Sequence, residues 1–177
     1  TNADVNDSPR GNADIRQLTR GARLQIPVNV EGALFSLGDA HYAQGDSECC
    51  ITAIETGATA VVRFKLLPGE ARRNGMRFPR FSHPGWFAAP QWAAPHNFVA
   101  TTGLPIREDG TQECEDLTLA ARNALLEMIL LLGERGFSRE QAYVICSLAV
   151  DLRISNAVDL PNVTVSALLP EAIFERN

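Results

Sequence analysis

The residues best suited to chemistry gather in one short segment, GDAHYAQGDSE, which spans residues 38–48. Asp39 and His41 are two positions apart, so in an extended backbone their side chains leave the same face and could bind one metal ion together. Gly38 and Gly45 permit the tight turns that would bring a third group inward. The spacing therefore favours a small metal centre.

Two further carboxylates follow in the same segment. Asp46 or Glu48 could act as a base toward water bound by such an ion, because zinc can lower the pKa of that water to about 7. The alternative is an ordinary polar turn that carries a surface histidine, since D-x-H is a short pattern. The residue types alone leave both interpretations open.

The elements that must position this segment begin as strands. Alternation of apolar and polar residues marks 24–30, where a proline indicates an edge position, and a short strand is expected over 33–37. Residues 49–55 and 58–66 are separated by a Thr-Gly pair and predict a β-hairpin. The early part of the chain is therefore expected to be mainly β structure.

Helical periodicity is confined to the C-terminal third. Residues 116–133 place apolar side chains at helical spacing, and a second helix begins at Ser138 with a capping-box pattern and runs to about Val150. A long proline-rich loop over 68–105 is expected to contain an edge strand near 98–101. The order predicts an α+β fold, with a β-rich sandwich or barrel-like core and two C-terminal helices.

Composition narrows the class of protein. The chain has 177 residues, 45% of them hydrophobic, and 16 basic against 21 acidic side chains, a net charge of −5. The basic residues are scattered and form no phosphate-binding stripe, so we expect neither nucleic acid nor a membrane as partner. The cysteines lack CxxC spacing and two are adjacent, which favours a reducing, cytoplasmic setting.

Longer stretches of the sequence carry a resemblance. VEGALFSLGDAHYAQGDSE, preceded by GNADIRQLTRGARLQIPV and followed by AIET, closely resembles the acetamidase/formamidase family, in which a GGNMD motif precedes a VEGA strand and a GD-H-AQGD-E segment. TTGLP, SREQAYVICSLAVDLRISNAVD and LPEAIF then follow that family's C-terminal pattern in order. The resemblance covers Gly11 to Phe174 and is more specific than any one motif.

The resemblance implies a metal-assisted hydrolase that cleaves linear carboxamides, such as formamide or acetamide, into a carboxylate and ammonia or an amine. Zinc is the first expectation for the ion and calcium the second. Glu48 and Glu31 are then candidates for the base or for orienting the ligands, and Gln44 or a backbone N–H for donating to the developing oxyanion. The implied metal ligands are Asp14, Asp39 and His41.

The sequence departs from the family pattern in two respects. Arg10 and Ala13 replace the first Gly and the Met of GGNMD, and Ser47 replaces the glycine of GDGE. The loop over 72–97 is rich in Phe, Trp and Pro, which would suit a bulkier or aryl amide. The candidate walls of its pocket are Trp86, Phe87 and Trp92, and the alternative is that these rings pack the loop onto the β core.

Family members are about twice as long as this chain, so the resemblance implies a separate N-terminal-half polypeptide, in a heterodimer or a larger hetero-oligomer. Residues 1–22 show no hydrophobic periodicity and are expected to be an extended segment packing on that half, with 23–177 as the C-terminal domain. One alternative is autoproteolysis, which would expose Thr1 as an N-terminal nucleophile with its α-amine as base. Another is a non-catalytic subunit that binds a structural cation.

Overall fold

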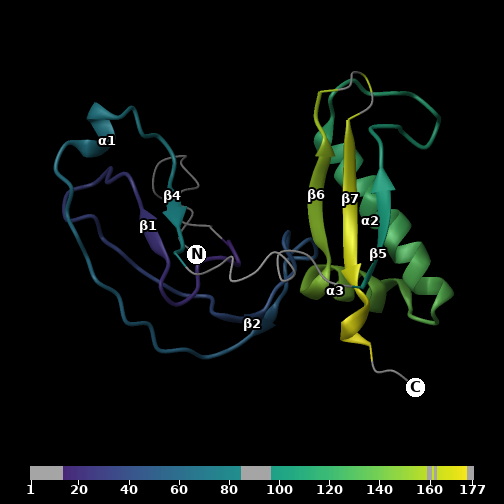
Figure 1. The fold of residues 1–177 in the computed structure, drawn as a ribbon, viewed down its shortest axis with the longest axis horizontal. Coiled ribbons are helices and arrows are strands. Elements are labelled where there is room, and N and C mark those ends of the chain that lie inside the picture. Colours follow the sequence, from purple (N-terminus) through teal and green to yellow (C-terminus); the bar gives the residue numbers. More distant parts are fainter. Residues whose placement is uncertain (1–13, 85–96, 159–160, 162, 175–177) are drawn as a thin grey trace. The chain divides into compact units, whose positions relative to one another are not determined.

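The computed structural model describes residues 14–84, 97–158, 161 and 163–174 (Figure 1). They fall into two compact units, each described by itself. The first unit is the described part of Thr1–Ala40 and Glu55–Ala88, and the second is the described part of His41–Ile54 and Ala89–Asn177. Small sheets and two long helices make the fold α+β, as predicted.

The second unit contains a three-stranded antiparallel sheet with strand order β5-β7-β6 (Figure 1). Its strands are β5 (Phe98–Gly103), β6 (Asp151–Asn156) and β7 (Thr164–Pro170). In the register, Val99 of β5 lies opposite Leu169, and Leu152 of β6 lies opposite Ala167. The edge strand expected near 98–101 is confirmed as β5, whereas β6 was not predicted.

Two helices accompany this sheet, α2 (Leu117–Glu134) and α3 (Arg139–Ala149). The Asp116 carboxylate accepts a hydrogen bond from Leu119 N at 2.9 Å and caps α2. Ser138 and Gln141 form a reciprocal capping box at the start of α3. Both predicted helices are confirmed. They could be predicted because capping residues close in sequence specify where each helix begins.

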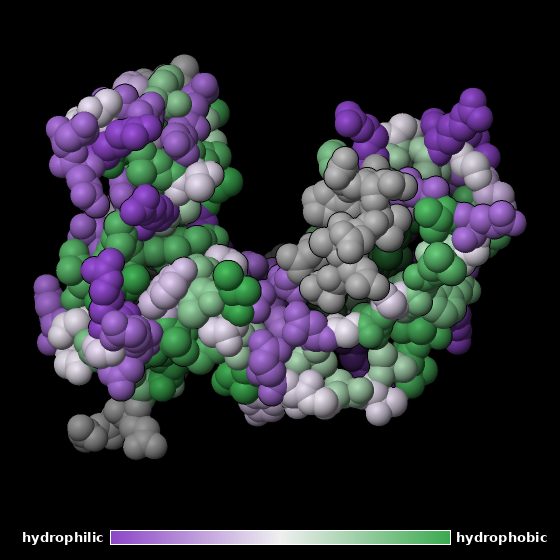
Figure 2. Space-filling model, turned by 180° about the vertical axis from the view of Figure 1, so that it is seen from behind, coloured by the Kyte–Doolittle hydropathy of each residue, from purple (hydrophilic) through white to green (hydrophobic). Residues whose placement is uncertain are grey.

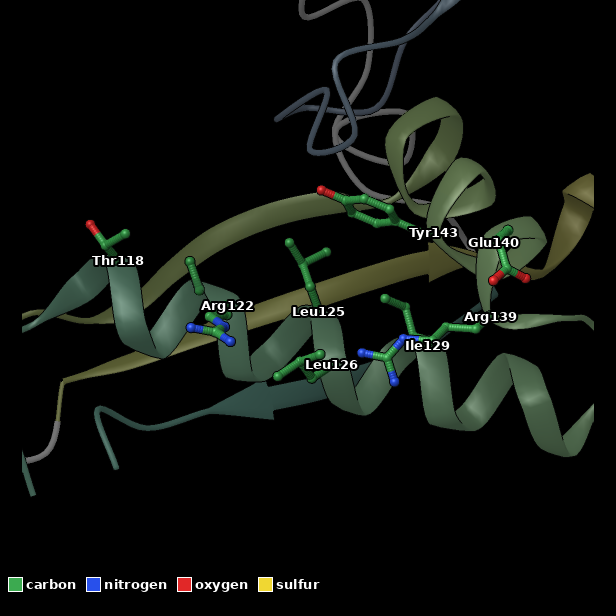
Figure 3. Close-up of a pocket in the computed structure, with 9 residues that line it drawn as sticks. Thr118, Arg122, Leu125, Leu126, Ile129, Arg139, Glu140 and Tyr143 are labelled. Carbon is green, nitrogen blue, oxygen red and sulfur yellow. The ribbon is translucent and has the colours of Figure 1, made fainter. Parts of the chain in front are cut away.

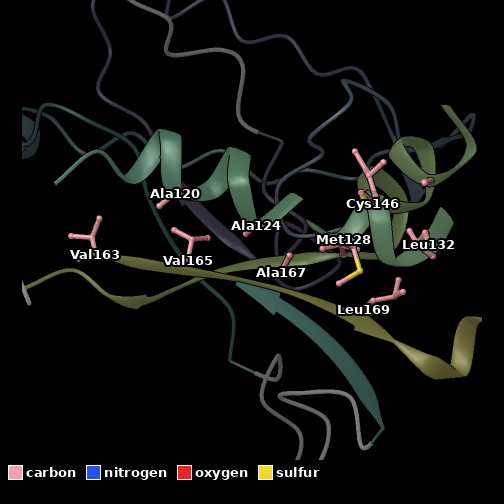
Figure 4. Packing of buried hydrophobic residues seen from close by; sticks show 12 residues of the cluster. Ala120, Ala124, Met128, Leu132, Cys146, Val163, Val165, Ala167 and Leu169 are labelled. Carbon is pink, nitrogen blue, oxygen red and sulfur yellow. The ribbon is translucent and has the colours of Figure 1, made fainter. Parts of the chain in front are cut away.

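The hydrophobic core lies between these helices and one face of the sheet (Figure 4). Alternate residues of β7 are buried, as expected for a strand with one covered face. The buried members of this core cluster are Ala120, Ala124, Met128, Ile129 and Leu132 of α2, Ala142 and Cys146 of α3, and Val150, Val163, Val165, Ala167 and Leu169.

A glycine allows α2 to lie close to the sheet. A Cβ at Gly103, the buried end of β5, would overlap the backbone of α2 at Ala120 and Ala124. Thr101 Oγ1 donates a hydrogen bond to the Ala124 carbonyl oxygen at 2.7 Å, from the same strand to the same helix. The absence of a side chain at position 103 therefore sets the spacing of these two layers.

The first unit has fewer regular elements. β1 (Arg23–Gln25) pairs antiparallel with β4 (Arg80–Ser82), and α1 (Glu70–Arg73) is a single short turn of helix. Next to β4, His83 Nε2 lies 2.9 Å from the carbonyl oxygen of Arg20. Elsewhere, β2 (His41–Ala43) forms a two-stranded sheet with β3 (Ile54–Glu55).

The predictions of strands before residue 67 are partly wrong. The strand over 24–30 ends at Gln25, because Pro27 has no N–H to contribute to a ladder. Ala33 and Leu34 have φ values of 58° and 46°, which places them in a turn rather than in a strand over 33–37.

The predicted hairpin of 49–55 with 58–66 is also wrong. β3 pairs with β2 instead, and residues 57–66 carry no strand pairing within the described structure. The alternation of 58–66 indicates a strand but does not specify its partner.

Among the described helices, none has the length and apolar character required to cross a bilayer.

Candidate functional site

The first unit brings two of the predicted metal ligands together. A carboxylate oxygen of Asp14 and one of Asp39 lie within 4.8 Å of each other. Asp39 has a φ of 63°, a left-handed conformation that Asp tolerates better than most residues, and it follows Gly38 directly. Two oxygens that each lie about 2 to 2.5 Å from one ion are at most about 5 Å apart, so this spacing fits a shared cation.

The second unit begins at His41, the first residue of β2, and orients its imidazole. His41 Nδ1 and Gln44 Oε1 are 2.8 Å apart. Because an amide oxygen can only accept, Nδ1 carries the proton in this hydrogen bond, and Nε2 of the neutral ring is the basic nitrogen. This is the arrangement in which a histidine is held as a metal ligand by a partner behind it.

Glu48 lies on the Nε2 side of the same ring. Its Oε1 is 4.0 Å from His41 Nε2, and both side chains are largely shielded from solvent, at 13% and 9% exposed respectively. Glu48 has a φ of 47°, so the backbone turns sharply at this residue. The segment therefore places a carboxylate and an imidazole on the same side of one loop.

The loop that carries these side chains is fixed to the end of α3. Gly45 N donates to the Ser147 carbonyl oxygen at 3.0 Å, and a Cβ at Gly45 would lie 2.6 Å from the carbonyl oxygen of Val150. Ser147 Oγ accepts from Cys50 N at 3.1 Å and donates to the Thr52 carbonyl oxygen at 2.6 Å. Position 45 therefore requires glycine for this close contact.

A buried carboxylate on β6 contacts the same loop. Asp151 is 5% exposed, and its Oδ1 accepts a hydrogen bond from Asp46 N at 3.1 Å. In return, Leu152 N lies 3.4 Å from the Asp46 carbonyl oxygen. Arg153 Nη2 is 3.8 Å from Asp151 Oδ2. The hydrogen bond from Asp46 N to Asp151 therefore joins β6 to the loop, and no motif of the sequence predicts it.

Two cysteines near the loop, Cys49 and Cys146, are poor nucleophiles. Burial raises the pKa of the Cys49 thiol to about 11 and that of the Cys146 thiol to about 12. Each therefore remains protonated near neutral pH, and a thiol is far less nucleophilic than a thiolate. Cys146 belongs to the hydrophobic core and Cys49 packs against it, so both serve as small apolar side chains.

The remaining predicted residues are not assembled with this loop. Glu31 is exposed. Two sets of carboxylate and imidazole side chains among the described residues are close enough to share an ion, and Glu31 is in neither set. Glu55, which ends β3, lies in the AIET segment that carries the family resemblance, and the sequence predicts no role for it. Thr1, Trp86, Phe87 and Trp92 lie outside the described residues.

A separate groove lies between α2 and α3 (Figure 3). It has a volume of about 530 Å³, and sequence reasoning gave no sign of it. Arg122 and Arg139 flank its apolar lining, which includes Leu125 and Ile129. It contains none of the predicted site residues, so it is distinct from the loop that carries His41.

The second unit is an α+β unit that carries an imidazole and a carboxylate on one glycine-containing loop, and the first unit holds a close pair of carboxylates. Side chains of these types could bind a divalent ion. The Acetamidase/Formamidase family matches residues 6–176, and the chain belongs to this family. Among solved structures, a gamma lactamase from Delftia acidovorans is similar to this chain with a TM-score of 0.74 and 32% identity, over 93% of this chain and 40% of that chain.

Two further proteins are similar to this chain in sequence. A formamidase from Methylophilus methylotrophus is 34% identical over 167 residues, which is 93% of this chain and 40% of the relative. An acetamidase from Mycolicibacterium smegmatis is 36% identical over 137 residues, which is 76% of this chain and 33% of the relative. The chain thus spans about two fifths or less of the length of these relatives.

Proposed function

We propose that this chain carries the metal-binding part of an amide hydrolase that releases a carboxylate and ammonia or an amine. The observation that carries the proposal is the orientation of His41 by Gln44, with Glu48 4.0 Å from the other ring nitrogen, in a member of the acetamidase/formamidase family. An oriented imidazole next to a shielded carboxylate is suited to holding an ion and moving protons beside it.

The proposed ligands are Asp14, Asp39 and His41. The close pair of carboxylate oxygens in the first unit supports two of them, and His41 follows Asp39 by only two residues in the chain. An imidazole donor favours zinc over calcium, which takes oxygen ligands. When bound, such an ion supplies Lewis-acid polarisation of the amide carbonyl and a more acidic water.

Two side chains of the loop, Glu48 and Gln44, have proposed roles in proton transfer and in stabilising the oxyanion. Glu48 is the proposed base that takes a proton from the attacking water and delivers one to the leaving nitrogen. Within the loop, the N–H groups of Gly45 and Asp46 donate to Ser147 and Asp151, and those of Ser47 and Glu48 donate to Gly45 O. The amide group of Gln44 is therefore our choice as donor to the developing oxyanion.

The proposed substrates are linear carboxamides of the formamide and acetamide type. This rests on the names of the relatives, a formamidase and an acetamidase. Trp86 and Trp92, with Phe87, would extend the range to bulkier amides if they line the pocket. The four cysteines are free thiols, which agrees with the cytoplasmic setting that we propose.

The proposed partner is a polypeptide that corresponds to the part of the relatives not matched by this chain. Residues 58–66 support this, because they have strand alternation and pair with no strand among the described residues. They also expose Val62, Phe64 and Leu66 at 50%, 69% and 76%. Apolar side chains, coloured green, are visible on the surface in Figure 2. A β-strand of the partner would cover such an edge, and residues 1–22 would pack on the same polypeptide.

Metal removal on the native assembly tests this function. Ammonia release from formamide, acetamide and benzamide should fall to the background rate after chelation and return when Zn²⁺ is added. Asp39→Ala and His41→Ala should each lower bound metal and activity by at least about 100-fold, because each removes a ligand. Asp109→Ala is the matched control, since Asp109 caps an exposed turn through Thr111 N at 2.9 Å.

Each alternative has its own outcome. Activity that survives chelation but is lost in Thr1→Ala would overturn the metal-assisted mechanism in favour of an N-terminal nucleophile. Metal binding without hydrolysis of any amide in the panel would indicate a non-catalytic metal-binding subunit. Unchanged metal content in both Asp39→Ala and His41→Ala would refute the ligand assignment.

A further inference from the structure

We propose that Ser147 and Asp151 are positioning residues, which hold the loop of Gln44 and Glu48 in the geometry required for the proposed amide hydrolysis. This inference rests on that proposed function and adds two residues with no side chain in the reaction. Ser147 is fully buried in α3 and Asp151 is 5% exposed at the start of β6. Both lie more than 90 positions from the loop in sequence.

The hydrogen bonds form a set along the loop. Ser147 contacts it at three points: its carbonyl oxygen accepts from Gly45 N, and its hydroxyl accepts from Cys50 N and donates to Thr52 O. Asp151 Oδ1 accepts from Asp46 N. The backbone is thereby held at four residues on both sides of Glu48, whose positive φ needs such support.

The location of these bonds explains why they matter for chemistry. Gln44 directly precedes Gly45, so the bond from Gly45 N to Ser147 fixes the backbone beside the side chain that orients His41. Glu48 lies between the anchor at Asp46 and the anchor at Cys50. Loss of either anchor lets the Glu48 carboxylate move relative to the ring, and small displacements of reacting groups lower the turnover rate.

Burial of a carboxylate costs free energy, because the charge is removed from water, and packing alone would not offset that cost. Asp151 Oδ2 has Arg153 at 3.8 Å, but that arginine is 44% exposed. The hydrogen bond from Asp46 N is the shorter interaction and links β6 directly to the loop. An asparagine can accept the same bond through its Oδ1 without a charge, which separates the positioning role from an electrostatic one.

The test compares Asp151→Ala, Asp151→Asn and Ser147→Ala in the native assembly. Asp151→Ala and Ser147→Ala should lower kcat by about 10- to 100-fold with little change in KM. This is the usual effect of losing a residue that holds catalytic groups in place without contacting the substrate. Asp151→Asn should restore most of kcat. Hydrogen exchange at the amides of Asp46 and Cys50 should be faster in the alanine variant of the respective partner and close to wild type in Asp151→Asn.

Thr101→Val is the control for a purely structural effect. It removes another hydroxyl-to-carbonyl hydrogen bond of the same unit, from Thr101 to Ala124, and should lower Tm without lowering kcat or changing exchange at Asp46. If Asp151→Ala fails to fold, kcat and hydrogen exchange are compared between wild type, Ser147→Ala and Asp151→Asn.

Wild-type exchange and kcat in the alanine variants would overturn the proposal, as would an Asp151→Asn variant as impaired as Asp151→Ala. If the wild-type assembly hydrolyses no amide, the proposed function fails. The exchange rates at Asp46 and Cys50 still decide whether Ser147 and Asp151 fix the loop.

Discussion

At the scale of single residues, His41 shows how a neighbour sets the chemistry of a ring. Gln44 lies three positions further along the chain and its amide oxygen accepts from Nδ1, so the basic nitrogen is the one that faces Glu48. The sequence predicted Gln44 as a substrate contact, and the structure adds a second use for the same side chain. Orientation of a histidine by an amide is a contact that spacing alone does not reveal.

Thiol reactivity gives a prediction at this scale. Cys146 is fully buried with a pKa raised to about 12, whereas Cys114 is exposed. Iodoacetamide at pH 8 should therefore label Cys114 at least about 100-fold faster than Cys146, because only thiolates react. Labelling of Cys146 should increase as pH rises toward 12 in the folded protein. Mass spectrometry of tryptic peptides measures both, and equal rates at pH 8 would refute the assignment of Cys146 to the core.

At the scale of elements, local signals and long-range contacts differ in what they make predictable. The starts of α2 and α3 were predicted because Asp116 and Ser138 cap helices within a few residues of themselves. The bond from Asp46 N to Asp151 joins residues 105 positions apart, and no periodicity specifies it. The false hairpin has the same cause, because alternation identifies a strand but tertiary contacts choose its neighbour.

The contact between α2 and β5 gives a prediction for elements. Gly103→Ala should lower the free energy of unfolding by about 1 to 3 kcal/mol or more, because the new Cβ overlaps the backbone of Ala120 and Ala124 and a backbone cannot rotate away. Denaturant unfolding followed by circular dichroism measures the change.

Gly133 provides the matched control for this prediction. It lies within α2, and a Cβ there meets no atom within 4 Å. Gly133→Ala should therefore leave the free energy of unfolding unchanged or raise it by up to about 1 kcal/mol, because alanine is a better helix former than glycine and Gly133 lies in the last turn. Equal effects of the two substitutions would show that the helix does not approach β5 closely at Gly103.

At the scale of the whole molecule, the two units differ in how much of their apolar surface is covered. The second unit encloses a core between its helices and sheet, which explains why its elements were the easier ones to predict. The first unit exposes Val61 at 97%, and the strands in its described part are short. The chain spans 40% of the length of the formamidase to which it is similar.

The last prediction concerns the surface of residues 58–66. Alternation places Val62 and Phe64 on one side of the segment and Arg63 on the other, and the Phe64 ring already has an edge contact with Phe35 at 5.0 Å. If a partner strand covers this edge, amides of 58–66 exchange slowly in the native assembly and rapidly in the isolated chain. Phe64→Asp should weaken association measured by light scattering, whereas Arg63→Ala should not. Rapid exchange in both states would show that the partner binds elsewhere, because paired strand amides are protected from solvent.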